Sequence, residues 1–194
     1  MQPTLHTPRL TLRPFHRDDS DDVERLAGDV RVAATTAAIP HPYPKGAAAV
    51  WIATHASKFD TLTGVDYAIT DSESGELLGA ISLLNLSAAH ARCEIGYWVA
   101  HNHWSMGICS EAARALIVYA HSALGITRVV AHCLARNVGS SRVMEKAGLL
   151  REGRLARHVC HQGAFEDVLL YGMVFPEREA PSQLQGDAHG SLRI

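Results

Sequence analysis

The chain has 194 residues, of which 47% are hydrophobic and 20% are charged. This length suits a single domain, and the composition is that of a globular protein rather than a disordered or membrane-embedded chain. A net charge of −2 excludes the overall basic field on which binding to nucleic acids and anionic membranes usually depends. We therefore expect no direct nucleic-acid or membrane partner. Residues 1–12 lack the apolar core of a signal peptide, which favours the cytoplasm.

The four cysteines lie far apart without CxxC spacing, so we expect reduced thiols. Twelve histidines are present, but no third and fourth ligands fall at zinc-like spacing, and we expect no metal site. Residues 176–194 are polar and aperiodic, which predicts a C-terminal tail after one domain at residues 1–175. Packing of this tail on a second copy is one way in which the chain would form a homodimer.

The first predicted element is an edge strand at residues 9–15, where apolar and polar side chains alternate. Acidic residues at the start of residues 18–27 and the stop signal of Gly28 predict a short helix. The proline-rich residues 39–44 predict a surface loop that would border a substrate site in an enzyme. A second helix is expected over residues 46–59.

Three strands of a meander are expected next, at residues 67–69, 77–86 and 93–99. In the third strand, alternation sends the cysteine, isoleucine, tyrosine and valine side chains to one face. The opposite face then carries Glu94 together with Trp98.

A long helix is predicted between Ser110 and Leu124, with Ser110 as N-cap and Gly125 as the stop. The residues that follow predict a strand, a helix and two strands, at residues 128–134, 138–146, 150–160 and 165–175. The whole order is β-α-α-β-β-β-α-β-α-β-β, with about seven strands and about four helices. This is a mixed αβ domain with one βαβ crossover near its centre, beside which we expect the chemistry.

The turn from His101 to Glu111 joins a predicted strand directly to this long helix. A helix N-terminus leaves about four N–H groups unpaired and carries roughly half a positive charge, which favours a diphosphate ligand. Gly107 would let the backbone approach such a ligand closely. The alternative is a plain strand-to-helix turn with an N-cap.

The segment Trp-Ser-Met-Gly-Ile-Cys at residues 104–109 resembles the Q/R-x-x-G-x-G/A pyrophosphate loop of the GNAT acetyltransferase superfamily. Other segments resemble the Rim-type branch of that superfamily, the ribosomal-protein alanine N-acetyltransferases. The similarity runs in order over residues 9–174. The segments of the Rim-type resemblance are Thr7 to Phe15, Glu94 to Val99, Glu111 to Leu116, and Asn137 to Gly148.

The resemblance implies a GNAT fold, in which a central, mostly antiparallel twisted sheet contains a splayed parallel pair flanked by helices. It also implies acetyl-coenzyme A as co-substrate, without a metal. The pantetheine arm would lie in the gap between the strands at residues 93–99 and 128–134. Cys109 departs from the small residue of the general pattern and would crowd the pyrophosphate. The implied cofactor contacts are Trp98, Val99, Trp104, Ser105, Met106, Gly107, Ile108, Cys109 and Ser110.

By the same resemblance, Asn137 reaches the arm near the thioester, although it is also placed to be the N-cap of the helix at residues 138–146. Many members of the superfamily use a tyrosine of this helix to protonate the leaving thiol. The aligned residue here is Met144, so Ser140 is expected to contact both the cofactor and its sulfur as the catalytic substitute.

Acetyl transfer to an amine requires a base that removes a proton from the ammonium group. Glu94 is the candidate catalytic base, acting directly or through a water; the alternative is an ion pair with Arg92. The expected activity is acetyl transfer to a primary amine, namely the N-terminal α-amine of a protein such as a ribosomal protein. The alternatives are a small amine such as an antibiotic or polyamine, or, because of Met144, a non-catalytic acyl-coenzyme A binding module.

Overall fold

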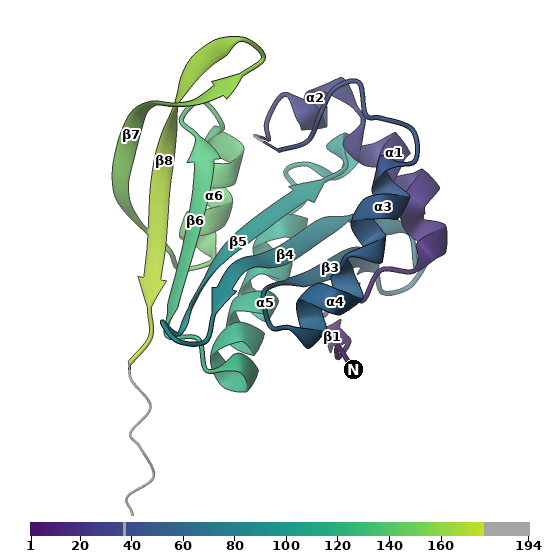
Figure 1. The fold of residues 1–194 in the computed structure, drawn as a ribbon, viewed down its shortest axis with the longest axis horizontal. Coiled ribbons are helices and arrows are strands. Elements are labelled where there is room, and N and C mark those ends of the chain that lie inside the picture. Colours follow the sequence, from purple (N-terminus) through teal and green to yellow (C-terminus); the bar gives the residue numbers. More distant parts are fainter. Residues whose placement is uncertain (37, 177–194) are drawn as a thin grey trace, which may run out of the picture.

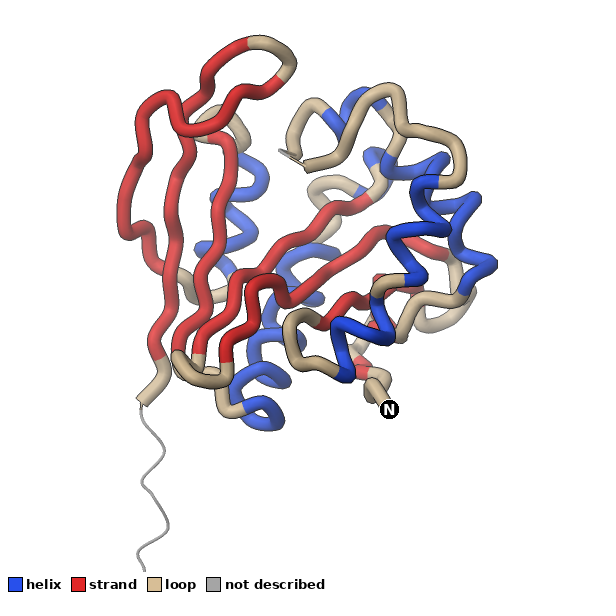
Figure 2. Tube along the Cα trace, viewed as in Figure 1, coloured by secondary structure: helices blue, strands red, loops and turns tan. Residues whose placement is uncertain are grey.

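A computed structural model describes residues 1–36 and 38–176. One sheet of eight strands, in the order β1-β2-β3-β4-β5-β6-β8-β7, carries helices on both faces (Figures 1 and 2). The strands are β1 (Leu5–His6), β2 (Leu10–Arg13), β3 (Val65–Asp71), β4 (Leu77–Ser87), β5 (Arg92–Val99), β6 (Arg128–Leu134), β7 (Leu150–His161) and β8 (Ala164–Val174). The α-helices are α1 (Ser20–Ala27), α2 (Val30–Ala33), α3 (Ala47–Ala53), α4 (His55–Asp60), α5 (Ile108–Leu124) and α6 (Val138–Lys146).

The strands β5 and β6 form the parallel pair of an otherwise antiparallel sheet. They pair only from Arg92 opposite Arg128 to Ile95 opposite Ala131. Beyond that point β5 stays on β4 as far as Val99, while β6 stays on β8 as far as Leu134, so the two strands diverge (Figure 1). The predicted mixed αβ fold with a splayed parallel pair is thereby confirmed.

Two groups of buried side chains fix what each face of the sheet contacts. Helix α5 packs its apolar stripe on the face to which β5 sends Ile95 and Val99. Helices α1 and α3 cover the other face, on which Trp98 packs against their buried side chains. Since side chains alternate along a strand, Glu94 lies on the same face as Trp98 and points away from α5.

Several predicted boundaries are wrong for identifiable reasons. The sheet has eight strands rather than about seven, because β1 is too short to show alternation in the sequence. The predicted helix at residues 46–59 is divided at Thr54, whose hydroxyl donates to the Trp51 carbonyl (2.7 Å). Short α2 was not predicted at all. Ser110 is not an N-cap, because α5 begins at Ile108 and the cap is Gly107.

The structure bears on the predictions for the cysteines, a membrane span and the tail. All four cysteines are free thiols. Among the described residues, no helix is both long enough and apolar enough to cross a membrane. The predicted tail lies, apart from Pro176, outside the described residues, so the domain boundary at residue 175 stays a prediction.

Candidate functional site

The loop between β5 and α5 has the backbone of an anion cradle. Ser105 and Gly107 both have left-handed backbone conformations, with φ of 64° and 80°. The first regular bond of α5 runs from the Glu111 amide to the Gly107 carbonyl. Within the described residues, no acceptor is found for the amides of Ile108, Cys109 and Ser110, which therefore remain open to an anion. These open amides, in a loop whose residues 104–107 are exposed, fit a diphosphate.

A clamp from the N-terminal segment holds this cradle in place. Both carboxylate oxygens of Glu111 are engaged, by the Thr7 hydroxyl (2.6 Å), the Arg9 amide (3.0 Å) and Arg9 Nε (2.8 Å). Arg9 Nη1 also donates to the Met106 carbonyl (3.1 Å). Burial alone would raise the pKa of Glu111, but the hydrogen bonds from Thr7 and Arg9 outweigh it and lower that pKa. The clamp brings a guanidinium charge to the cradle.

Trp104 occupies one of the backbone groups expected to hold the pantetheine arm. Its indole Nε1 donates to the Val99 carbonyl (2.8 Å). Because the Ala100 amide donates to Leu78 on β4, alternation along the antiparallel ladder turns the Trp98 backbone toward β4 and the Val99 N–H toward the gap. The gap therefore offers the Val99 amide, since the Val99 carbonyl already accepts from Trp104. The expected backbone contact of the pantetheine arm at Trp98 is not available, because the Trp98 backbone pairs with β4.

Asn137 and Ser140 lie where β6 leads into α6. Asn137 is the N-cap of α6: its Oδ1 accepts from the Ser140 amide (3.0 Å), and its Nδ2 donates to the Thr35 carbonyl (2.9 Å). Asn137 therefore is the expected N-cap of α6. A contact between Asn137 and the pantetheine arm stays a prediction. Met144, where the resemblance implies a tyrosine, is buried in the core.

Tyr97 is a candidate functional residue that the sequence analysis missed. Its hydroxyl lies 2.9 Å from Ser140 Oγ and donates to the Ser140 carbonyl (3.1 Å). Burial raises the pKa of Tyr97, and the hydrogen bond with Ser140 opposes this only in part. The resemblance points to a tyrosine on the helix, whereas this one reaches the same helix from the diverging half of β5.

Two cysteines lie on the side of the gap that carries Tyr97 and Ser140. Burial raises the pKa of Cys109 to about 12, so that its thiol is neutral at physiological pH. Cys133 is buried on β6, with its Sγ 3.5 Å from Ser141 Oγ. Burial also raises the pKa of Cys133, against the hydrogen bonds from the two neighbouring serines. Neither thiol adds charge to the gap.

Glu94 is on the opposite face of the sheet, at the point of divergence. Its Oε1 lies 2.8 Å from His132 Nδ1, and its Oε2 accepts from Asn85 Nδ2 (3.1 Å). The alternative was an ion pair between Glu94 and Arg92, but the partner of Glu94 is His132. Sequence reasoning could not find this contact, because it depends on the register of two strands.

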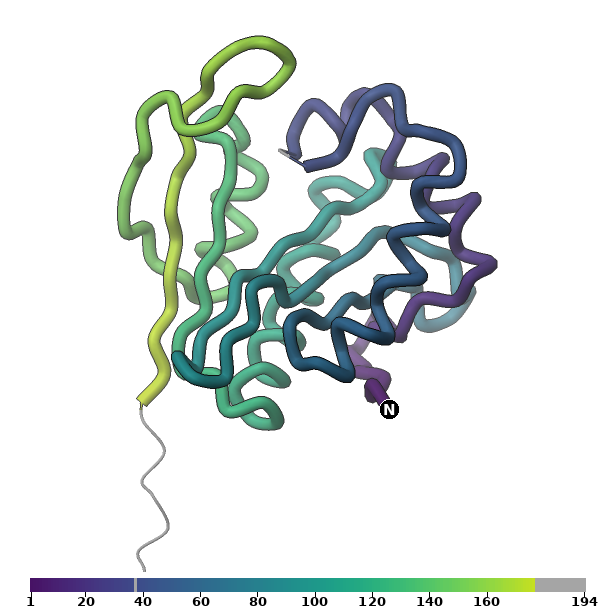
Figure 3. The backbone as a smooth tube through the Cα atoms, in the orientation of Figure 1, coloured from purple at the N-terminus to yellow at the C-terminus, as the bar shows by residue number. Residues whose placement is uncertain are grey.

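Two hydrogen bonds connect the end of α2 and the chain after it to the far side of the gap. One is the bond from Asn137 to Thr35; in the other, His161 Nε2 lies 3.4 Å from the Ala33 carbonyl. His161 is itself held by Arg136 Nη2 (3.3 Å), which forms a two-point ion pair with Glu166. Figure 3 shows the segment after α2 approaching the β7–β8 hairpin.

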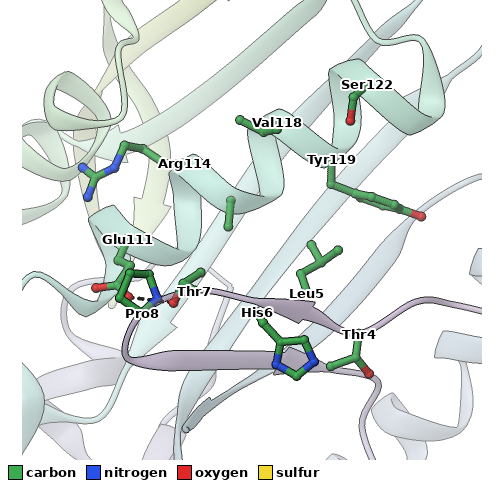
Figure 4. Close-up of a pocket in the computed structure, with 11 residues that line it drawn as sticks. Thr4, Leu5, His6, Thr7, Pro8, Glu111, Arg114, Val118, Tyr119 and Ser122 are labelled. Atoms are coloured by element: carbon green, nitrogen blue, oxygen red, sulfur yellow. Dashed lines mark hydrogen bonds between the residues drawn. The ribbon is translucent and has the colours of Figure 1, made fainter.

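A groove of about 700 Å³ lies outside this site, between β1 and the outer side of α5 (Figure 4). It meets the cradle only at its end, where Pro8 and Glu111 line it. In the described part of the chain, no group of three or more histidine, cysteine, aspartate or glutamate residues is placed to hold a metal ion.

An anion cradle beside a splayed parallel pair, with polar side chains on both faces of the gap, defines an acyltransferase of mixed αβ fold. Residues 9–150 match the family described as "Acetyltransferase (GNAT) domain". The chain belongs to this family and is an N-acetyltransferase, which confirms the resemblance seen in its motifs.

Similar proteins agree with this assignment. The chain is 30% identical over 185 residues to an uncharacterized N-acetyltransferase, YoaA, of Bacillus subtilis, covering 91% of this chain and 99% of that protein. It is 33% identical over 99 residues to the ribosomal-protein-serine acetyltransferase of Escherichia coli, covering 51% and 55% respectively. A solved structure of RimL, a ribosomal L7/L12 α-N-protein acetyltransferase in complex with coenzyme A, shares the fold with a TM-score of 0.82 at 18% identity, covering 89% of this chain and 98% of that one.

Proposed function

We propose that this protein transfers the acetyl group of acetyl-coenzyme A to the α-amino group of a protein N-terminus in the cytoplasm. The single observation that carries the donor half is the cradle, in which three open amides of α5 meet the charge of Arg9 at the mouth of the gap. A diphosphate is the ligand that such a helix start favours.

Bound acetyl-coenzyme A would supply the acetyl group as a thioester. In this proposal the loop from Trp104 to Ser110 holds the pyrophosphate, and the Val99 amide faces the pantetheine arm in the gap. Trp104 orients this stretch through the Val99 carbonyl. Asn137 shapes the start of α6, so that the Ser140 hydroxyl faces the gap beside Tyr97.

The two faces of the gap would divide the proton transfers. Ser140, together with Tyr97, would stabilise and protonate the leaving thiolate on the face covered by α5 and α6. Glu94 would assist removal of the proton from the acceptor ammonium on the other face. The separation fits direct transfer, because the acceptor amine and the acid for the leaving thiolate would face the thioester from opposite faces of the sheet.

A protein acceptor is supported by the relative named ribosomal-protein-serine acetyltransferase. That protein is matched over 55% of its length, so the support concerns the class of acceptor rather than its identity. The splayed strands and the cradle are equally compatible with a small amine, and the acceptor therefore needs direct measurement.

Calorimetry with acetyl-coenzyme A, followed by mass spectrometry of an acceptor panel, tests the proposal. The panel holds peptides with free serine or alanine N-termini, the same peptides blocked at the N-terminus, and polyamine and aminoglycoside amines. We expect cofactor binding and a mass gain of one acetyl group on the free peptides alone. Acetylation of only the small amines would reassign the acceptor, and binding without any transfer would indicate a non-catalytic module.

A further inference from the structure

Glu94 and His132 form a carboxylate–imidazole pair at the point where β5 and β6 part. Glu94 Oε1 lies 2.8 Å from His132 Nδ1. His132 is the first β6 residue beyond the last parallel pair, which joins Ile95 to Ala131. We propose that His132, oriented by Glu94, is the base that takes the proton from the acceptor amine. This inference rests on the proposed function and assigns its proton-removing step to a different residue.

The sheet places this pair on the side of the gap away from the thiol partners. Glu94 lies opposite Val130 in the register, so both point to one face, and His132 follows Val130 at the interval that restores that face. Tyr97 points to the other face, where its hydroxyl meets Ser140. An amine that approaches beside His132 would therefore reach the thioester carbon from the side opposite the leaving sulfur.

The hydrogen bond fixes which nitrogen of His132 is available. With the Nδ1 proton donated to the Glu94 carboxylate, the lone pair of neutral imidazole is on Nε2, and the carboxylate stabilises the imidazolium that forms. Within the described residues, Glu94 is the one partner of the His132 ring. The His132 side chain is 40% exposed and that of Glu94 24%, so the ring is reachable while the carboxylate is more enclosed.

The proton and electron movements balance with these groups and water. His132 Nε2 takes one proton from the acceptor ammonium, and the freed pair on nitrogen forms the new C–N bond at the thioester carbonyl. The C–S bond breaks with its electron pair on sulfur, which takes a proton from the Tyr97–Ser140 side. The nitrogen passes its remaining excess proton through water to the Tyr97–Ser140 pair, which restores the acid, and His132 returns its proton to water, so that one proton is released per turnover.

Few other charges on this face compete with the pair. The remaining ionisable side chains of β5 and β6 there are Arg92 and Arg128, and Arg128 is paired with Glu152. On β8 the neighbour directly opposite His132 is Leu170, which is uncharged.

The test compares His132→Asn with Glu94→Gln in the full chain. Asparagine places an N–H group where Nδ1 stood and keeps the bond to Glu94, but it has no counterpart of Nε2. His90→Gln is the matched control, because His90 is exposed in the turn between β4 and β5. We measure kcat against pH at saturating substrates, acetyl-coenzyme A binding by calorimetry, and melting temperature. If the melting temperature of His132→Asn is well below that of the wild type, His132→Gln is used in its place.

We expect His132→Asn to lower kcat about 100-fold, the usual effect of losing a general base, and to abolish the fall of kcat at acid pH. Cofactor affinity should stay within about threefold. Glu94→Gln should slow turnover but retain the acid limb, since the imidazole remains. Retention of that limb in His132→Asn, together with its loss in Glu94→Gln, would overturn the inference in favour of Glu94. If the wild-type protein binds no acetyl-coenzyme A and acetylates no amine, the proposed function fails, and this inference fails with it.

Discussion

The Tyr97 hydroxyl lies 2.9 Å from Ser140 Oγ, which joins the diverging half of β5 to the first turn of α6. Met144, where the resemblance implies a tyrosine, is buried, and Tyr97 reaches the first turn of the same helix from a strand. An acid that protonates a thiolate must itself be protonated. Because burial raises the pKa of Tyr97, its hydroxyl keeps its proton over the whole physiological range.

Tyr97→Phe is expected to lower kcat about tenfold with little change in acetyl-coenzyme A affinity, since the ring remains and the hydroxyl is lost. Ser140→Ala should have a similar effect. The double variant should lose less than the product of the two, because both side chains serve one step. Steady-state kinetics of the three variants measure this. Tyr119→Phe, on the outer side of α5, is the control, and full additivity would argue against a shared role.

Gly107→Ala should weaken acetyl-coenzyme A binding by at least about tenfold. Its φ of 80° is strained for alanine, and a Cβ would stand in the cradle 3.5 Å from Arg9 Nη2. Gly75→Ala is a matched control, since Gly75 has φ of 75° in the turn between β3 and β4 with no atom near the added carbon. Both variants should lose a similar amount of stability, and calorimetry should show that only the first loses affinity. Equal affinities would remove the cradle from cofactor binding.

Glu111→Gln should loosen the clamp on the cradle and lower the free energy of unfolding by about 1 kcal/mol. A larger effect is not expected, because Arg9 is half exposed and water screens the ion pair. The pKa of Glu111 is lowered in the folded state, so the clamp stabilises fully above the ordinary glutamate pKa and is lost as pH falls through the lowered value.

Urea unfolding at pH 7 and pH 3 measures this difference. The variant and the wild type should differ at pH 7 and approach each other at pH 3. Asp22→Asn, which removes an exposed pair with Arg25, should have almost no effect at either pH. A Glu111→Gln variant as stable as the wild type at pH 7 would contradict the role of the clamp.

Asn137 makes two hydrogen bonds, to the Ser140 amide and to the Thr35 carbonyl, that substitutions can separate. Alanine removes both the cap of α6 and the bond to Thr35, and it should lower the free energy of unfolding by about 1 to 2 kcal/mol. Aspartate still accepts from the Ser140 amide but cannot donate to the Thr35 carbonyl. Asn137→Asp should therefore keep most of the cap while raising the KM of the acceptor, measured by peptide kinetics and thermal unfolding. An unchanged KM would show that the bond from Asn137 to Thr35 does not influence acceptor binding.

The sequence predicts best what short stretches decide. Strand β6 and helix α6 begin and end at the predicted residues, because β-branched residues, the Asn137 cap and Gly148 mark them locally. The start of α5 was misplaced because its cap is a left-handed glycine backbone rather than the serine side chain. Local signals thus give most elements, and non-standard caps are where they fail.

Local sequence pattern likewise indicates single residues of the candidate site but not the partners that they contact. Glu94 follows from strand alternation, but its partner His132 is 38 residues away and meets it only through the β5–β6 register. Likewise Arg9 and Glu111 both lie in segments that resemble the family, yet nothing local pairs residues 102 positions apart. Partners of a site residue are set by topology, which residue spacing does not encode.

His55 gives a last test, of stability rather than activity. It is buried against Phe15 and Trp51, and within the described residues neither of its ring nitrogens has a hydrogen-bond partner. Burial lowers the pKa of His55 to about 4, although the nearby Asp66 carboxylate opposes the shift. The unfolded chain therefore binds a proton more readily than the folded one, and stability should fall as pH drops from about 6.5 toward 4.

His55→Phe should remove this loss, because phenylalanine keeps the ring contacts and has no site to protonate. We expect the wild type to lose about 1 to 2 kcal/mol more than the variant between pH 7 and pH 5, measured by urea unfolding. His90→Phe, at an exposed turn, controls for the removal of a histidine as such. Parallel pH profiles of His55→Phe and wild type would mean that His55 does not become harder to protonate when the chain folds.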